Sequence, residues 1–177
     1  ADPAFKGKKR ELVVEDYIYS MKRVMDPKNH SPTFSFIEGK ILGADAAIQQ
    51  AKSSGQFNYD APIAGLKALD KYTLQITLTR SDFNFPYIMA YVTFSGTARE
   101  VIEHYGARAG QHPVGTGPYQ LHKYVPRSRI ELKANPDYRG FSWNFKGENT
   151  AWDQRLVKEM SGKKMPQIGM VKVSIIE

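Results

Sequence analysis

The sequence contains no cysteine at all. This absence excludes disulfides, thiolate chemistry and zinc sites built on cysteine, although it does not choose between cellular compartments. A run of 18 apolar residues is also missing, so we predict no membrane-spanning helix. The first residues lack the charged, apolar and small-residue order of a secretory signal. We therefore expect the chain to start inside a longer protein or at a processed end.

Motifs that carry catalysis are absent as well. The sequence holds no P-loop, no GxSxG and no HExxH, and GTGP at 115–118 lacks the spacing and the following helix of a dinucleotide fingerprint. The histidines are widely spaced, and none pairs with another at i, i+4: His30, His104, His112 and His122. Metal or general-base roles remain open for them, but surface or strand-face positions are the simpler interpretation. We predict no enzyme activity, no cofactor and no metal site.

Acidic residues are outnumbered by basic ones, which gives a formal charge of +7. Such an excess is compatible with a nucleic-acid or membrane partner. The basic residues are scattered, however, and only the run at 6–10 is dense, so we interpret them as solvated surface. Hydrophobic residues make up 41% of the sequence, a globular composition, and 177 residues suffice for one domain or parts of two.

The stretch 113–140, PVGTGPYQLHKYVPRSRIELKANPDYRG, combines a glycine-rich entry with two alternating patterns. Gly115 and Gly117 flank a threonine and precede Pro118, and we predict positive φ at least at Gly117. Apolar residues then alternate with polar ones in two runs, at Tyr119, Leu121 and Tyr124 and at Ile130 and Leu132. These patterns predict two half-buried antiparallel strands. Asn135-Pro136 ends the second strand, because proline cannot donate to a ladder.

A helix is predicted from Val14 to Met25, with an acidic pair near its start and Lys22-Arg23 near its end. Asp26-Pro27 should end it. A short second helix should begin with Ser31 as cap and Pro32 at its first position. Further elements are predicted in this order: a helix at Asp45–Lys52, a hairpin at Leu66–Leu78, short helices at Phe83–Tyr91 and Ala98–Tyr105, a helix at Asp153–Met160 and a strand at Ile168–Ile176.

Two of these segments carry a family resemblance. GTGPYQL, the strand IELKANPDY and the following Arg-Gly resemble a segment of the family 5 extracellular solute-binding proteins, which are the oligopeptide, dipeptide and nickel-binding receptors of bacterial ABC importers. The helix VVEDYIYSMKRVMDPKN, with its acidic pair, basic pair and Asp-Pro, is also similar to that family. The hairpin GLKALDKYTLQITLTR resembles it too. The likeness covers most of residues 11–140 and gives least guidance for the insertion 141–166.

The resemblance implies an α+β fold, a fragment of a periplasmic-binding-protein type II-like fold. Residues 1–97 would be a piece of the small accessory domain, and 98–177 would be part of the first ligand-binding lobe. Such receptors enclose peptides or similar small solutes by two-lobe closure and deliver them to ABC permease subunits in the membrane. The implied location is periplasmic, or extracellular and membrane-associated in a Gram-positive host. No nucleic-acid partner is expected.

By the same resemblance, two residues match ligand-facing positions. Thr33 stands where oligopeptide receptors place a Tyr, and Tyr91 stands where they place a His after an aromatic helix. Both depart from the family pattern. Without a ligand role, Thr33 would be a helix-entry residue and Tyr91 a buried aromatic with a bonded hydroxyl. The aromatic run Phe83, Phe85, Tyr87, Tyr91 and Phe94 is either a stacking platform or, more simply, core.

A second hypothesis is a basic domain that binds single-stranded nucleic acid through Tyr and Phe platforms on the hairpins. Arg127 and Arg129 are interleaved with the aromatic residues there. This function requires the rings to be exposed together on one sheet face, with the basic residues alongside. A hydrolase is a weaker third hypothesis, since no nucleophile–base pair is evident.

Overall fold

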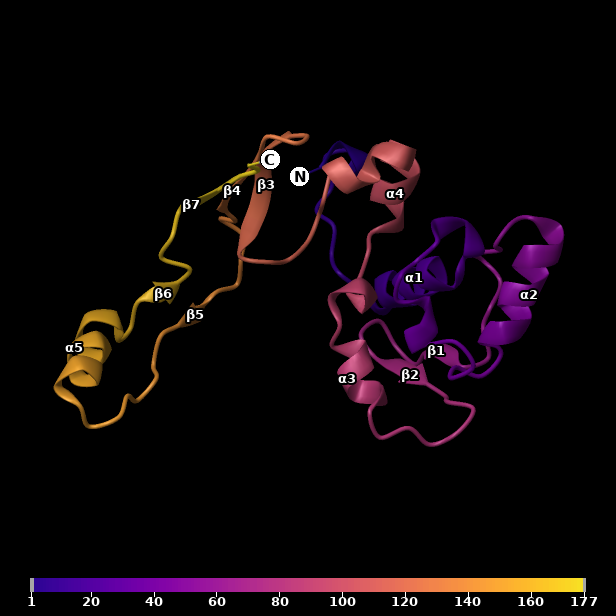
Figure 1. Ribbon diagram of the computed structural model, residues 1–177, viewed down its shortest axis with the longest axis horizontal. Helices are drawn as coiled ribbons and strands as arrows, with labels where there is room; N and C mark the ends of the chain where they lie inside the picture. The colour runs from indigo at the N-terminus through magenta and orange to yellow at the C-terminus, as the bar shows by residue number, and fades with distance from the viewer. Residues whose placement is uncertain (1, 177) are drawn as a thin grey trace. The chain divides into compact units, whose positions relative to one another are not determined.

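The computed structural model describes residues 2–176, shown in Figure 1. The chain divides into two compact units, Ala1–His104 and Tyr105–Glu177. We call them unit 1 and unit 2. The boundary predicted from the sequence lies between residues 97 and 98. The compact units divide between residues 104 and 105, at the end of the next helix. The assignment of the two parts to an accessory domain and a lobe stays a prediction.

Unit 1 is built around α1, Val14–Met25, which has the predicted bounds. Its apolar positions recur at helical spacing, and Met21, Val24 and Met25 are buried. Val13 at the N-cap offers no side-chain acceptor, but the Asp16 carboxylate accepts a hydrogen bond from the Val13 amide at 2.8 Å. This bond is the return half of a capping box, so a poor N-cap residue is still held in place.

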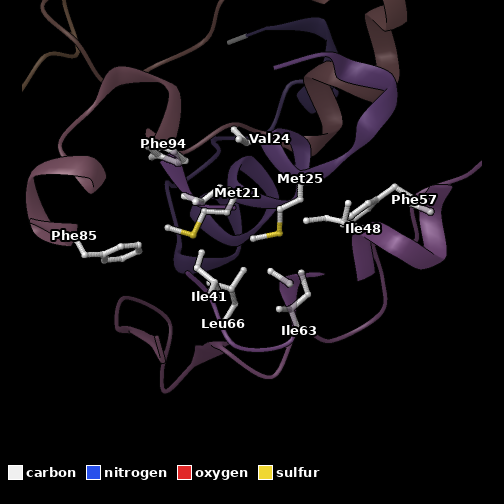
Figure 2. Close-up of a cluster of buried hydrophobic side chains, with 13 residues drawn as sticks. Met21, Val24, Met25, Ile41, Ile48, Phe57, Ile63, Leu66, Phe85 and Phe94 are labelled. Carbon is white, nitrogen blue, oxygen red and sulfur yellow. The ribbon is translucent and has the colours of Figure 1, made fainter. Parts of the chain in front are cut away.

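The other elements of unit 1 are η1 (Pro3–Phe5), η2 (Pro27–Asn29), η3 (Phe34–Phe36), α2 (Ala44–Ser54), β1 (Leu66–Ala68), β2 (Leu74–Ile76), α3 (Phe85–Met89), η4 (Val92–Phe94) and α4 (Arg99–Tyr105). Those from η3 to η4 in chain order contribute with α1 to one hydrophobic core. Figure 2 shows Met21 and Met25 of α1 among side chains from several of these segments. The largest fully buried side chains are Phe94, Met25, Ile37 and Ile41. Residues far apart in sequence therefore stabilise one another by burial.

Most predicted elements of unit 1 are present, with one correction. The helix expected after Ser31-Pro32 is only the single 3-10 turn η3, and Thr33 rather than Ser31 occupies its N-cap. The Ser31 hydroxyl lies 3.1 Å from the Thr33 hydroxyl, so it does not cap a backbone amide. The hairpin forms as predicted, since β1 and β2 pair antiparallel with Leu66 opposite Ile76.

Unit 2 contains a three-stranded antiparallel sheet in the order β3-β4-β7. Its strands are β3 (Tyr119–Val125), β4 (Arg129–Ala134) and β7 (Met170–Ser174). The first two form the predicted hairpin, and β7 is a shortened form of the predicted last strand. Unit 2 also holds η5 (Gly106–Gln111) and a two-stranded ladder of β5 (Phe141–Ser142) and β6 (Lys164–Met165). In the chain, α5 (Ala151–Met160) comes between β5 and β6, and its bounds are close to those of the helix predicted at 153–160.

A bulge in β3 explains the loose alternation of its sequence. Leu121 lies opposite Leu132, but Lys123 lies opposite Glu131, so His122 is the extra residue. The shift returns Tyr124 to the face that Leu121 occupies. One sheet face then carries only apolar and aromatic residues: Tyr119, Leu121, Tyr124, Ile130, Leu132, Ala134, Val171 and Val173. None of these eight residues is buried in the described chain.

Candidate ligand-binding residues and the polar motif of α1

Thr33 is buried, with 5% of its surface exposed, at the entry to η3. Its hydroxyl lies 3.1 Å from that of Ser31, and its carbonyl accepts a hydrogen bond from the Phe36 amide at 3.0 Å. Both groups stabilise the turn. The helix-entry role that sequence analysis weighed against ligand contact is thus one that Thr33 does perform, and a ligand role stays a prediction.

Tyr91 lies just before η4 and is 49% exposed, so it is not the buried aromatic of the simpler expectation. Its ring contacts Phe36 edge-to-face, with centroids 5.5 Å apart. Since Phe36 belongs to the turn that Thr33 begins, this ring pair brings the two predicted ligand segments together. Phe36 was not predicted as their link, and only its position three residues after Thr33 hinted at it.

The aromatic run around Tyr91 does not form a single platform. Phe85 and Phe94 are buried in the core of unit 1, as Figure 2 shows, so core packing accounts for them. Phe83 and Tyr87 are strongly exposed. The run therefore alternates between residues that anchor α3 and η4 and residues that remain accessible to a ligand or another surface.

The glycine motif differs from its prediction. Gly117 has no positive φ, and a Cβ added at Gly115 or Gly117 would meet no atom within 4 Å. The positive φ predicted for Gly117 is wrong, because Asn135 holds this segment without any need for that conformation. The side-chain amide of Asn135 donates to the Gly117 carbonyl at 2.9 Å, and the backbone amide of Asn135 donates to the Pro118 carbonyl at 2.9 Å.

Several polar residues of α1 and of its C-cap are buried and bind loops. The Ser20 hydroxyl donates to the Thr93 carbonyl at 3.2 Å. Asp26 accepts a hydrogen bond from the Tyr59 hydroxyl at 2.7 Å, and burial together with this bond raises the pKa of Tyr59. The motif that carries the family resemblance thus positions the segments around α1, and its residues act as scaffold.

Lys22 is the most unusual member of this motif. It is 7% exposed, and its ammonium donates to the carbonyls of Tyr59 at 2.8 Å and Ala61 at 2.7 Å. Within the described residues no carboxylate lies within ion-pairing distance of it. Burial lowers the pKa of Lys22, and the nearby Asp60 charge partly opposes that shift.

A pocket of about 460 Å³ lies beside α1. Its lining is mostly charged: Arg10, Glu15, Asp16, Ile18, Tyr19, Lys22, Tyr59, Asp60, Arg99, Glu100 and Glu103. Arg10 binds Asp16 and Glu100, and Arg99 binds Asp60 and Glu103. These bonds raise the pKa of both arginines and lower those of Asp60 and Glu100. Two arginines therefore occupy four carboxylates, and the pocket is chiefly an ion-pair network that fixes α4 to α1.

Within residues 2–176 no group of three or more metal-ligating side chains is found. In the same range no helix is long and apolar enough to cross a membrane. Of the four histidines, His112 stacks on Tyr105 with ring centroids 3.7 Å apart.

A family model matches residues 9–177, and its description is bacterial extracellular solute-binding proteins, family 5 middle. The chain belongs to this family. The match confirms the family that the GTGP loop and the α1 segment predicted, and it covers most of the sequence.

Curated relatives are similar in sequence. The periplasmic oligopeptide-binding protein OppA of Escherichia coli strain K12 is 30% identical over 138 residues, which are 75% of this chain and 23% of that protein. The glutathione-binding protein GsiB of Shigella flexneri is 32% identical over 94 residues, or 53% of this chain and 18% of that protein. The chain thus spans about a quarter or less of the length of these relatives.

Solved structures share the fold. The substrate-binding domain of an oligopeptide ABC transporter of Bacillus anthracis matches with a TM-score of 0.63 at 20% identity, over 94% of this chain and 27% of that one. The murein tripeptide-binding protein MppA of Escherichia coli matches with a TM-score of 0.58 at 27% identity, over 73% and 24%. The fold is therefore α+β, a fragment of a type II periplasmic-binding-protein fold, as predicted.

Proposed function

We propose that this chain is part of the substrate-binding component of an ABC importer. The whole receptor captures peptides or similar small solutes by closure of two lobes and delivers them to permease subunits in the membrane. It works in the periplasm, or outside the cell next to the membrane in a Gram-positive host. Binding energy is converted into a closed shape, and no bond is made or broken. The family match over residues 9–177 carries this proposal.

The named relatives support peptides as the ligand class. OppA is named for oligopeptides, GsiB for glutathione and MppA for murein tripeptide, and each of these compounds has a peptide backbone or a close analogue of one. We propose that Thr33 and Tyr91 face the ligand. The contact between Phe36 and Tyr91 supports this assignment, because it joins both segments beside a half-exposed phenol.

The test uses the whole receptor that contains this chain. Titration calorimetry with dipeptides to pentapeptides should show binding, and Tyr91→Ala should weaken it about tenfold through lost aromatic contact. Tyr72→Ala is the control, because Tyr72 is an exposed tyrosine whose hydroxyl donates to Glu11. A receptor that binds no peptide would overturn the ligand class. Equal losses of peptide affinity from both substitutions would overturn the proposed role of Tyr91 and leave the ligand class standing.

The nucleic-acid hypothesis requires exposed rings and basic residues on one sheet face. The register separates them instead. Tyr119 and Tyr124 lie on the apolar face with Leu132, whereas Arg129 pairs with Val125 on the opposite face. The Tyr119 hydroxyl also donates to the Ile168 carbonyl at 3.1 Å. The sheet thus lacks the arrangement that this second function needs.

A further inference from the structure

The positive charge of the chain is concentrated in unit 2. Residues 105–177 hold 12 Lys and Arg against 6 Asp and Glu, whereas residues 1–104 hold 13 against 12. In the described part of unit 1, the basic residues that form ion pairs are Arg10, Lys40, Lys71 and Arg99. In the described part of unit 2, residues 105–176, a single ion pair is formed, between Arg129 and Glu131. Unit 2 therefore presents basic side chains that its own carboxylates do not neutralise.

Part of this charge lies on a projecting segment, residues 141–165, which we call the arm. Its base is the β5–β6 ladder, in which Phe141 lies opposite Met165, and the Trp143 amide extends it by donating to the Lys163 carbonyl at 2.9 Å. In Figure 1, α5 lies beyond β5 and β6, at the far end from the sheet of the same unit. Basic residues of the arm are Lys146, Arg155, Lys158, Lys163 and Lys164.

The arm also exposes large aromatic side chains. Trp152 is 68% exposed and Phe145 is 61% exposed, and half of Phe141 is accessible. On α5, residues 152, 155 and 158 recur at a spacing of three, so Trp152, Arg155 and Lys158 share one exposed side of the helix, on which the exposed Glu159 follows Arg155 by four residues. Leu156 and Met160 are only half-buried. An exposed indole beside cations is the chemistry of side chains that settle at the headgroup level of a bilayer.

We propose that the arm is a docking surface for an anionic membrane, with Trp152 and Phe145 entering the headgroup region and Arg155 and Lys158 pairing with lipid phosphates. Each basic residue near an anionic leaflet adds attraction, and the aromatic rings add burial in the interface. This surface would keep the receptor close to the membrane in which its permease lies.

The ring geometry favours lipid over single-stranded nucleic acid. Trp143 and Phe145 meet at 65° with centroids 5.4 Å apart, and Phe141 and Phe145 meet at 88°. Bases need ring faces that are accessible in succession, but edge-to-face rings cover one another. Insertion among headgroups has no such requirement, because it depends on exposed aromatic area beside positive charge.

Tryptophan fluorescence tests the proposal directly, since both tryptophans of the chain, Trp143 and Trp152, lie in the arm. The probe is a set of vesicles of phosphatidylcholine mixed with phosphatidylglycerol, compared with vesicles of phosphatidylcholine alone. We expect a blue shift and co-sedimentation with the anionic vesicles only, both lost as salt rises. The double variant R155Q/K158Q should partition about tenfold more weakly or worse. W152F should retain most of the partitioning and W152A should lose it.

Control variants distinguish binding by the arm from non-specific adsorption to vesicles. F83A removes an even more exposed aromatic side chain, in unit 1, and should leave partitioning unchanged. Equal binding to both kinds of vesicle, no binding to either, or tighter binding to single-stranded DNA at matched salt would each overturn the proposal. The whole receptor is tested in parallel. If it fails to bind where the chain alone binds, the rest of the receptor covers the arm and the proposal is wrong.

Discussion

Lys22 is a buried cation whose hydrogen-bond acceptors are the neutral carbonyls of Tyr59 and Ala61. We expect Lys22→Met to keep the aliphatic volume but to leave both carbonyls without a donor. The free energy of unfolding should fall by about 1–3 kcal/mol, the usual cost of buried polar groups that lose their partner. Lys52→Met, on the exposed side of α2, is the control. Urea unfolding followed by circular dichroism measures both, and an unchanged midpoint for Lys22→Met would contradict the scaffold role.

Gly117 tests the corrected backbone at the GTGP loop. Because its φ is not positive and a Cβ would meet no atom within 4 Å, Gly117→Ala should be neutral or should stabilise by up to about 1 kcal/mol. Gly43 is the matched contrast, with φ of 78° and a Cβ position 3.3 Å from Ala64. Gly43→Ala should cost about 1 kcal/mol or more. Thermal melts decide, and a lowered midpoint for Gly117→Ala would contradict the unstrained backbone found at this loop.

The stability of the fold should depend on pH through Glu100, and the direction of this dependence follows from its pKa. Its bonds to Arg10, at 3.0 and 3.2 Å, lower its pKa below 4.5 in the folded chain. The ionised Glu100 therefore stabilises the fold fully at pH values above its pKa in the unfolded chain. This stabilisation disappears as pH falls through its lower pKa in the folded chain. Glu100→Gln should cost less than about 1 kcal/mol at pH 7, since the carboxylate is partly exposed.

The difference between Glu100→Gln and the parent chain should vanish in acid, below the lowered pKa. Denaturation at a series of pH values checks this convergence. Glu38→Gln serves as control, because Glu38 is exposed and forms no ion pair in the described chain. A constant difference at all pH values would mean that the glutamine disturbs packing, and that the Arg10 bond is not the cause.

At the scale of elements, α1 and the β3–β4–β7 sheet differ in burial. Eight residues of α1 are buried, whereas unit 2 has no buried residue in its described part. Local stability follows burial of apolar contacts, so amides of β4 should exchange hydrogen faster than amides of α1. In the whole receptor, where further polypeptide can cover the apolar sheet face, β4 should gain protection. Exchange measured by mass spectrometry on both proteins checks this, and β4 protection equal to that of α1 in the isolated chain would contradict it.

Local patterns were sufficient for the elements that carry their own signals. The bounds of α1 followed from apolar spacing and Asp26-Pro27. Helix α2 was predicted at Asp45–Lys52 and runs from Ala44 to Ser54, where Gly55 with φ of 73° ends it. The bulge at His122 was not predicted, because the extra residue is defined by its partner strand. The turn after Pro32 was predicted too long, since Thr33 and not Ser31 is its N-cap and it ends at Phe36.

At the scale of the whole molecule, a chain that spans about a quarter of its relatives should not enclose a ligand. We therefore predict that the isolated chain binds free peptides negligibly, because two-lobe closure requires the remainder of the receptor. Calorimetry with dipeptides to pentapeptides checks this. Low-micromolar binding to the isolated chain would show that its own residues form a complete site.

The sequence by itself determined the family, the fold class and the helices and hairpins whose apolar period and end signals lie within a few residues of each other. Tertiary structure decided what joins distant segments. Strand β4 pairs with β7 about forty residues later in the chain, Phe36 contacts Tyr91, and Asn135 holds Gly117. The physical reason is that a period or a cap is set by neighbours in sequence, whereas register, ring contacts and the φ of Gly117 depend on groups that meet only after folding.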